Sequence, residues 1–110
     1  MLAVIFEITP TPQGRQDYFD IASDLKASLI KIDGFISVER FQSLTSPGTF
    51  LSLSFWRDEE AVSHWRNLAE HRAAQQQGLD TLFEHYRIRV AQVCRDYNHQ
   101  QREQAPDDSQ

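Results

Sequence analysis

The sequence predicts an α+β fold whose strands and helices follow one another in the order β-α-β-β-α-β. Four segments alternate between two faces and are rich in β-branched and aromatic residues, which is typical of strands. Two segments repeat apolar residues every three or four positions, which is typical of helices that face a core. The chain has 110 residues, a usual size for one domain.

The first strand and the first helix are predicted over residues 2–9 and 15–32. The strand sequence LAVIFEIT is largely apolar on both faces, so we expect both faces to be covered. In the helix, Tyr18, Leu25 and Leu29 belong to one apolar stripe. An Asp-Gly pair follows and predicts the end of the helix, because glycine adopts the left-handed conformation at little cost.

The next two strands are predicted over residues 35–44 and 49–57, with a Ser-Pro-Gly turn between them. So short a connection makes the two strands a hairpin. Phe55 and Trp56 are adjacent in the second of them. Because neighbouring strand residues point to opposite faces, the two rings cannot both line one pocket.

The second helix is predicted to begin at Asp58, a good N-cap, and to end near Gly78. Residues 84–97 form a long alternating segment, which predicts the last strand. The remaining residues, 98–110, contain almost no apolar side chain, and we expect them to be a disordered polar tail. The folded domain is therefore predicted to span residues 1–97.

This order of elements is that of the ferredoxin-like split βαβ fold, an antiparallel sheet with both helices on one face. The other face also carries apolar side chains, such as Ile5 and Val93, which should not stay in water. A second copy is the simplest cover, so we expect a homodimer. Glu7, Arg87 and Arg89 are expected on this face, and their pairing across the dimer is a hypothesis.

The composition excludes several functions. The net charge is −5, which argues against a nucleic-acid partner because phosphate binding needs a basic surface. No apolar run is long enough to cross a membrane, and the N-terminus lacks the features of a signal peptide. Cys94 is the only cysteine, which argues against a cysteine-based metal site, and its apolar neighbours predict a buried, inert thiol. We expect a cytoplasmic protein without a bound metal.

Three stretches resemble the antibiotic biosynthesis monooxygenase (ABM) domain family of dimeric α/β-barrel proteins. They read S-F-W-R-D-E-E-A-V-x-x-W, then E-H-R, and finally Y-R-I-R-V-A-Q-V-x-R-D-Y. The resemblance covers residues 2–97 and implies a ferredoxin-like protomer whose sheet packs against that of a second protomer. It also implies varied activities: some members oxidise aromatic polyketides with O₂ and no cofactor, others bind and degrade haem, and one is a quinol oxygenase.

The resemblance carries over residue by residue only in part. Trp65 matches the helix tryptophan that lines the pocket in both oxygenase branches. The cofactor-free branch has a tyrosine where this chain has His71, and an asparagine where it has Ala61. The haem-degrading branch has its iron-binding histidine where this chain has Gln75. Neither branch's set of residues is complete.

Trp65 and His71 are the candidate catalytic residues. Trp65 is expected to be a core aromatic, and its ring edge could also line a pocket or its indole N–H donate to a bound oxygen; these roles are not exclusive. On a regular helix His71 lies about 240° around the axis from Trp65, so the two converge only if the helix breaks near residues 67–70. With such a break His71 could act as a general base or a haem ligand; otherwise it is a surface or capping residue.

The leading hypothesis is a small dimeric ABM-type monooxygenase that acts on an aromatic or quinol-like molecule with O₂, without metal or flavin. His71 is the expected base and Trp65 its neighbour in the site. Candidate substrate-binding residues are the aromatic ones near this helix: Phe55, Trp56, Phe83 and Tyr86. Two alternatives stay open. One is a haem-binding or haem-degrading member with His71 as ligand, and the other is a dimeric small-molecule binder without catalysis.

Overall fold

The computed structural model describes the backbone of residues 1–76 and 82–108 and the side chains of residues 1–69 and 82–108. It confirms the predicted α+β, ferredoxin-like order of elements. These are β1 (Leu2–Pro10), α1 (Arg15–Leu29), β2 (Phe35–Gln42), β3 (Phe50–Trp56), α2 (Glu59–Gln76) and β4 (Phe83–Gln92). Within the described residues, none of the helices is long and apolar enough to cross a membrane.

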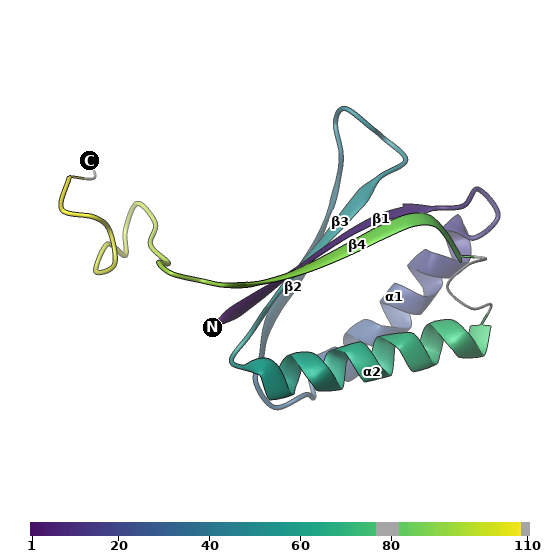
Figure 1. Cartoon of the computed structure of the whole chain (residues 1–110), viewed down its shortest axis with the longest axis horizontal. Helices are drawn as coiled ribbons and strands as arrows, with labels where there is room; N and C mark the ends of the chain where they lie inside the picture. Colours follow the sequence, from purple (N-terminus) through teal and green to yellow (C-terminus); the bar gives the residue numbers. More distant parts are fainter. Residues whose placement is uncertain (77–81, 109–110) are drawn as a thin grey trace.

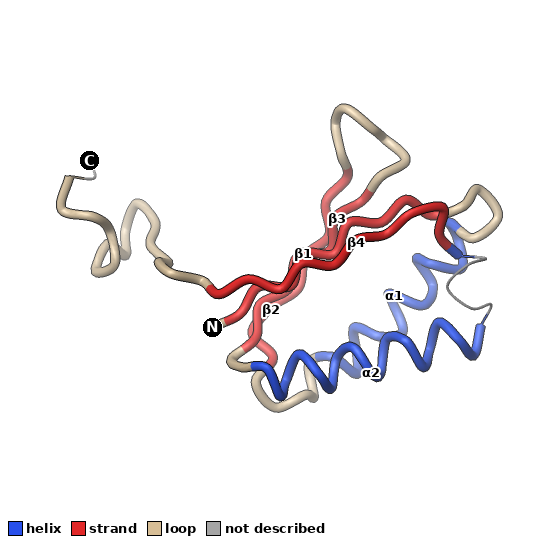
Figure 2. The backbone as a smooth tube through the Cα atoms, in the orientation of Figure 1, coloured by secondary structure: helices blue, strands red, loops and turns tan. Residues whose placement is uncertain are grey.

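The strands form one sheet in the order β2-β3-β1-β4, and each neighbouring pair is antiparallel. Both helices lie on the same side of this sheet (Figures 1 and 2). The last strand ends at Gln92 rather than continuing to residue 97 as predicted. Within the described residues β4 pairs with β1, which begins at Leu2, and beyond the strand the Val93 N–H donates to the Met1 carbonyl oxygen at 3.0 Å.

The core lies between the sheet and the helices. Leu2 and Val4 of β1 and Trp56 of β3 face the helices, and Val4 and Trp56 have no exposed surface. Leu25 of α1 and Val62 of α2 pack against them from the other side. The inward-facing side chains of the strands and the apolar side chains of the helices thus form one hydrophobic cluster.

The other face of the sheet is uncovered in the single chain. Ile5 lies at its centre, opposite Leu53 on one side and Arg89 on the other. Arg89 donates a hydrogen bond to the Glu7 carboxylate at 2.9 Å within the same chain. Ile5, Leu53 and Phe55 are only half-buried there, so this face keeps the apolar character that the sequence predicts.

An ion-pair network holds the start of α2 in place. Arg57 donates to both carboxylate oxygens of Asp33, at 3.1 and 3.0 Å, and to Asp58 at 2.9 Å. Asp58 also accepts the Ala61 backbone N–H at 3.0 Å, which confirms it as the N-cap. Gly34, beside Asp33, has a φ of 95°, which favours glycine. The loop before β2 is thereby tied to the corner between β3 and α2.

Residues 93–108 run away from the sheet toward the C-terminus (Figure 1). They form local turns, in which the Asn98 side-chain oxygen accepts the backbone N–H groups of Gln100 and Gln101 at 2.8 and 2.7 Å. The Arg102 guanidinium lies over the Tyr97 ring, 5.4 Å from its centroid. These contacts lie within the segment itself, and the disorder predicted for residues 98–110 stays a prediction.

Candidate active site

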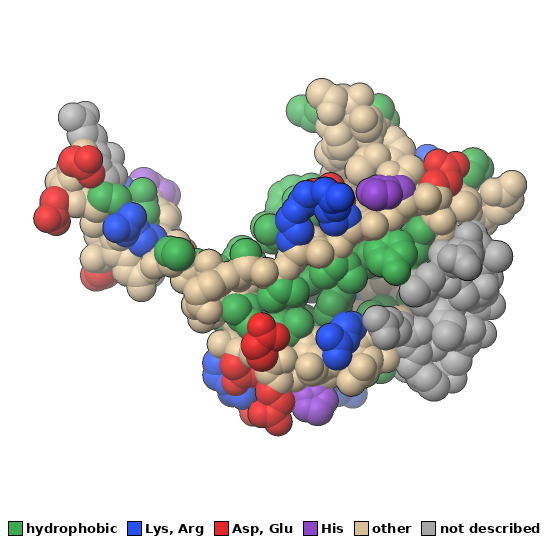
Figure 3. Space-filling model, viewed as in Figure 1, with side chains coloured by type: hydrophobic (Ala, Val, Ile, Leu, Met, Phe, Trp, Pro, Cys, Tyr) green, Lys and Arg blue, Asp and Glu red, His purple; other side chains and the backbone are tan. Residues whose placement is uncertain are grey.

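A cavity of about 140 Å³ lies between the two helices and the sheet. Hydrophobic side chains gather in the hollow between β4 and α2 (Figure 3). All four strands and both helices contribute to its lining. Its apolar lining includes the side chains of Phe6, Ile21, Leu25, Trp65, Phe83 and Ile88. A mostly apolar, concave site of this kind suits a small organic molecule.

Phe6, in the middle of β1, organises the aromatic wall. Its ring meets Trp65 with centroids 6.2 Å apart and planes at 78°, and Phe83 at 6.1 Å and 81°. Tyr86 is a third edge-to-face neighbour, at 6.0 Å and 82°. Edge-to-face pairs add stability beyond the area they bury, so these rings form a defined wall. Phe6 was not predicted as a site residue, although strand alternation places it on the helix side.

Trp65 is both a core residue and a cavity wall. Only 8% of it is exposed, and it belongs to the main hydrophobic cluster. Among the described residues its indole N–H has no hydrogen-bond partner, in contrast to that of Trp56, which donates to the Ser54 hydroxyl at 2.8 Å. The two alternatives for Trp65 are therefore compatible, and its N–H is available to a bound molecule.

The predicted binding residues separate into two groups. Phe83 and Tyr86 line the cavity together with Trp65. Trp56 is fully buried in the core beneath Phe35, with ring centroids 5.3 Å apart, and it does not reach the cavity. Phe55 lies on the opposite face of the sheet, as alternation requires. The structure thus brings together Trp65, Phe83 and Tyr86 and leaves Phe55 and Trp56 outside.

The backbone of His71 lies in α2, which runs without interruption from Glu59 to Gln76. The helix break near residues 67–70, on which the convergence of His71 with Trp65 was expected to depend, is absent. Residues 67–70 contain neither glycine nor proline, so no helix-breaking residue interrupts α2 there. The side chains of His71 and Gln75 lie outside the described residues, so a catalytic role for His71 stays a prediction.

The cavity also has polar residues that the sequence did not identify: Tyr18, Arg40 and Ser52. Tyr18 is only 6% exposed. Its burial raises the pKa of its phenol, an effect that the nearby positive charge of Arg40 opposes. The phenol is therefore protonated at neutral pH and can donate a hydrogen bond. Tyr18 was visible in the sequence only as a member of an apolar helical stripe.

Cys94 is exposed, not buried as predicted. The prediction was wrong because it placed this residue inside the last strand, whereas the strand ends two residues earlier, at Gln92. In the described part of the chain, no three His, Cys, Asp or Glu side chains are grouped closely enough to hold a metal ion.

The comparisons with known proteins agree with this architecture. The chain matches the family model of antibiotic biosynthesis monooxygenase over residues 1–77. It is 50% identical over 93 residues to the jasmonate monooxygenase ABM of Pyricularia oryzae, covering 84% of this chain but only 43% of that protein. It is also 31% identical over 93 residues to the uncharacterized protein YqjZ of Bacillus subtilis, covering 84% of this chain and 79% of the other.

Two solved structures show the same fold. Rv0793 from Mycobacterium tuberculosis matches with a TM-score of 0.75 and 18% identity, over 88% of this chain and 98% of the other. The putative antibiotic biosynthesis monooxygenase from Nitrosomonas europaea matches with a TM-score of 0.67 and 11% identity, over 86% and 99% of the two chains. The family model covers well over half of the sequence, and the chain therefore belongs to the antibiotic biosynthesis monooxygenase family.

Proposed function

We propose that this protein is a monooxygenase that oxidises a small aromatic or quinol-like molecule with O₂ in the cavity between the helices and the sheet. The observation that carries the proposal is the aromatic wall formed by Phe6, Trp65, Phe83 and Tyr86. Such a wall suits a flat ring. The fungal relative is named a jasmonate monooxygenase, so jasmonate joins the substrate panel, with an added two-electron reductant so that the second oxygen atom of O₂ can leave as water.

The chemistry needs no cofactor when the substrate is itself electron-rich. A phenolate or hydroquinone anion can pass an electron to O₂, and the protein then has to deprotonate the substrate, shield it and hold O₂ nearby. For a phenol reacting as its keto tautomer, a CH₂ carbon and one O₂ give a C=O group and one water. One oxygen atom enters the product, and the other leaves with the two hydrogens.

Two residues carry the proposed chemical roles. Trp65 donates its indole N–H to an oxygen of the substrate or of O₂, which is supported by its place in the cavity wall and by the absence of a partner among the described residues. His71 is the proposed base, because imidazole exchanges protons near neutral pH. The uninterrupted α2 gives no support to this second role, which rests on sequence position alone.

The proposal is tested by oxygen uptake. Purified protein is incubated in an oxygen electrode with a panel of phenols, hydroquinones and jasmonate, with boiled protein as control. We expect at least one substrate to consume O₂ at a rate that is proportional to protein concentration and saturates with substrate. Saturable binding without any oxygen uptake would instead favour the alternative of a non-catalytic small-molecule binder.

A haem titration separates the haem alternative. A saturable Soret band at one haem per protomer that His71→Ala abolishes would favour the haem branch, and its decay with ascorbate under air would indicate haem degradation. A flat titration would exclude that branch and leave the cofactor-free reaction as the candidate.

We also propose that the protein is a homodimer whose two sheets pack face to face. The support is the uncovered apolar face around Ile5, Leu53 and Phe55, whose exposure to water is unfavourable. Light scattering should give the mass of a dimer, and Arg87→Glu should weaken it, because Arg87 lies on this face opposite Glu7. A wild-type protein that stays monomeric at high concentration would contradict this proposal.

A further inference from the structure

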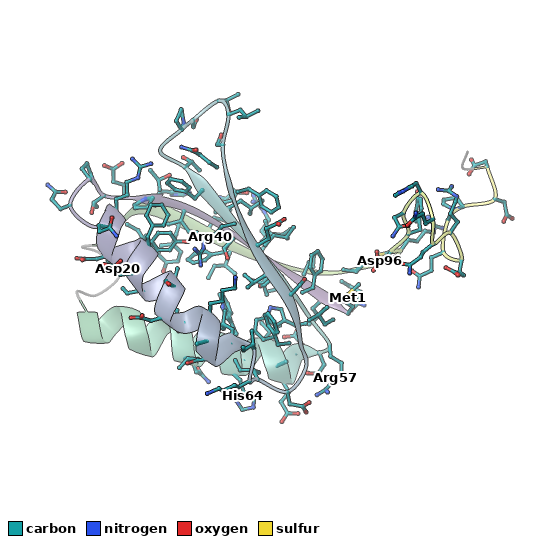
Figure 4. The ribbon with its side chains drawn as sticks, turned by 180° about the vertical axis from the view of Figure 1, so that it is seen from behind. Met1, Asp20, Arg40, Arg57, His64 and Asp96 are labelled. Atoms are coloured by element: carbon teal, nitrogen blue, oxygen red, sulfur yellow. The ribbon has the colours of Figure 1, made fainter. Side chains whose placement is uncertain are left out.

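The cavity has a polar end on the side of β2 and β3. Arg40 of β2 and Ser52 of β3 are directly opposite each other in the antiparallel register, so their side chains leave the same face of the sheet. Both line the cavity, and Tyr18 of α1 lines it from the helix side. Figure 4 shows the Arg40 side chain lying between the sheet and α1. Three hydrogen-bond donors from three different elements thus meet in one region.

The donors of this polar end are unused within the described residues. The ion pairs among the described residues join Arg57 to Asp33 and Asp58, and Arg89 to Glu7. None of them involves Arg40. The Tyr18 hydroxyl has no hydrogen-bond partner there either. Among the described residues, no side-chain polar atom is both fully enclosed and without a hydrogen-bond partner. The Tyr18 hydroxyl therefore keeps some accessible surface, and Tyr18 lines the cavity.

The charges around the cavity all have one sign. Its charged lining residues among those described are Arg40 and Arg66, and neither Asp nor Glu contributes. Arg40 is itself exposed, so it stands where the cavity meets solvent. A guanidinium presents donors in a planar fork that matches a carboxylate. An anionic group of a ligand can bind at Arg40 and keep part of its hydration. The apolar part of the same ligand can then fill the interior of the cavity.

We infer that the cavity takes an amphipathic carboxylate, whose carboxylate group is held by Arg40 with Ser52 and Tyr18, and whose apolar body lies against the aromatic wall of Phe6 and Trp65. This inference rests on the proposed function in that it names the substrate class of the same cavity. It makes Arg40 a specificity residue that distinguishes anionic from neutral molecules of the same shape, separate from any residue that acts on O₂.

The test is calorimetric titration with 4-phenylbutyrate and with its neutral amide, 4-phenylbutyramide, which have the same carbon skeleton. The wild type should bind the carboxylate about tenfold more tightly than the amide, the preference that one charge-assisted contact provides. In Arg40→Gln the preference should disappear, and Arg40→Lys should keep part of it. Lys31→Gln is the matched control, because it removes one exposed positive charge that does not line the cavity.

Equal binding of the two probes by the wild type, a preference that survives Arg40→Gln, or no binding of either probe would overturn the inference. Its failure is distinguishable from that of the proposed function. If neutral phenols are oxidised while the carboxylate has no advantage, the inference fails and the monooxygenase proposal stands. If the carboxylate binds in an Arg40-dependent way and no substrate consumes O₂, the inference stands and the proposed reaction fails.

Discussion

Phe6 of β1 meets Trp65 of α2 edge to face, with ring centroids 6.2 Å apart and ring planes at 78°. This contact joins the middle of the sheet to the middle of the second helix across the cavity. Phe83 and Tyr86, at the start of β4, meet the same Phe6 ring. This aromatic cluster therefore helps to set the position of α2 over the cavity, together with the core packing of Val62 and the Asp58 cap.

The two tryptophans should respond differently to the same substitution. Trp65→Phe keeps a ring in the wall but removes an N–H that is free to bind a ligand, so turnover should fall about a hundredfold, the typical effect of losing one transition-state donor. Trp56→Phe should leave the turnover of folded protein nearly unchanged. It should instead lower the free energy of unfolding by about 2–4 kcal/mol, because it leaves a void and an unsatisfied buried Ser54 hydroxyl. Steady-state kinetics and urea unfolding of both variants check this contrast, and equal loss of turnover in both would contradict it.

His71→Ala should sharply slow turnover and leave the dimer intact if His71 is the base. His64→Ala is the matched control, because His64 lies on the same helix and is exposed. The measurement is the oxygen-uptake rate of the two variants, with light scattering for their assembly. Wild-type turnover in His71→Ala would remove His71 from the mechanism and direct attention to the groups that line the cavity.

Two glycines provide a test of the fold. Gly34 has a φ of 95°, and a Cβ there would lie 2.9 Å from the Ala61 Cβ. Gly34→Ala should therefore reduce the free energy of unfolding by about 1–3 kcal/mol and disturb the start of α2. A Cβ at Gly48 would meet nothing within 4 Å, so Gly48→Ala should have little effect. Chemical denaturation of both variants measures the difference, and similar stabilities would contradict the steric and backbone strain argued for a side chain at Gly34.

Acid should weaken the network at the start of α2. The hydrogen bonds from Arg57 are the main reason that the pKa values of Asp33 and Asp58 are lowered. Carboxylates with lowered pKa values contribute stability above their unfolded pKa of about 4, and that contribution is lost as the pH falls through the lower folded values. The stability difference between wild type and Arg57→Gln should therefore be constant above about pH 5 and shrink below pH 4.

Urea unfolding at a series of pH values from neutral to acidic measures this difference. Lys31→Gln serves as the control for the loss of one positive charge, since the lysine takes no part in the network. A difference between wild type and Arg57→Gln that does not change with pH would mean that the pairs contribute nothing to folding.

The sequence predicted the fold because its signals are local. The alternation of residues 2–9 and the Asp58 cap depend on neighbours in the chain, and the structure confirms both. The end of the last strand was not predictable in this way. The end is set by where β1 begins, about ninety residues earlier in the chain. The prediction that Cys94 is buried was wrong for the same reason, because it depended on where β4 ends.

The sequence predicted only those cavity residues that lie in or near the second helix, which carries the strongest sequence signals. Trp65, Phe83 and Tyr86 were recognised as aromatic residues close to that helix, and they do share the cavity. Tyr18 and Arg40 were not recognised, because they come from α1 and β2 and reach the cavity only through the packing of the helices on the sheet. Polar residues of a site assembled from distant segments have no common pattern in the sequence.

The most direct test of the central claim is ¹⁸O₂ labelling of the product, compared between the wild type and Ala69→Phe. Ala69 lines the cavity one helical turn after Trp65, so a phenylalanine there should fill the cavity without removing a polar group. We predict that the wild-type product carries one ¹⁸O atom per molecule and that Ala69→Phe, folded as judged by circular dichroism, forms none. Product without ¹⁸O, or labelled product formed equally fast by Ala69→Phe, would contradict a monooxygenase site in this cavity.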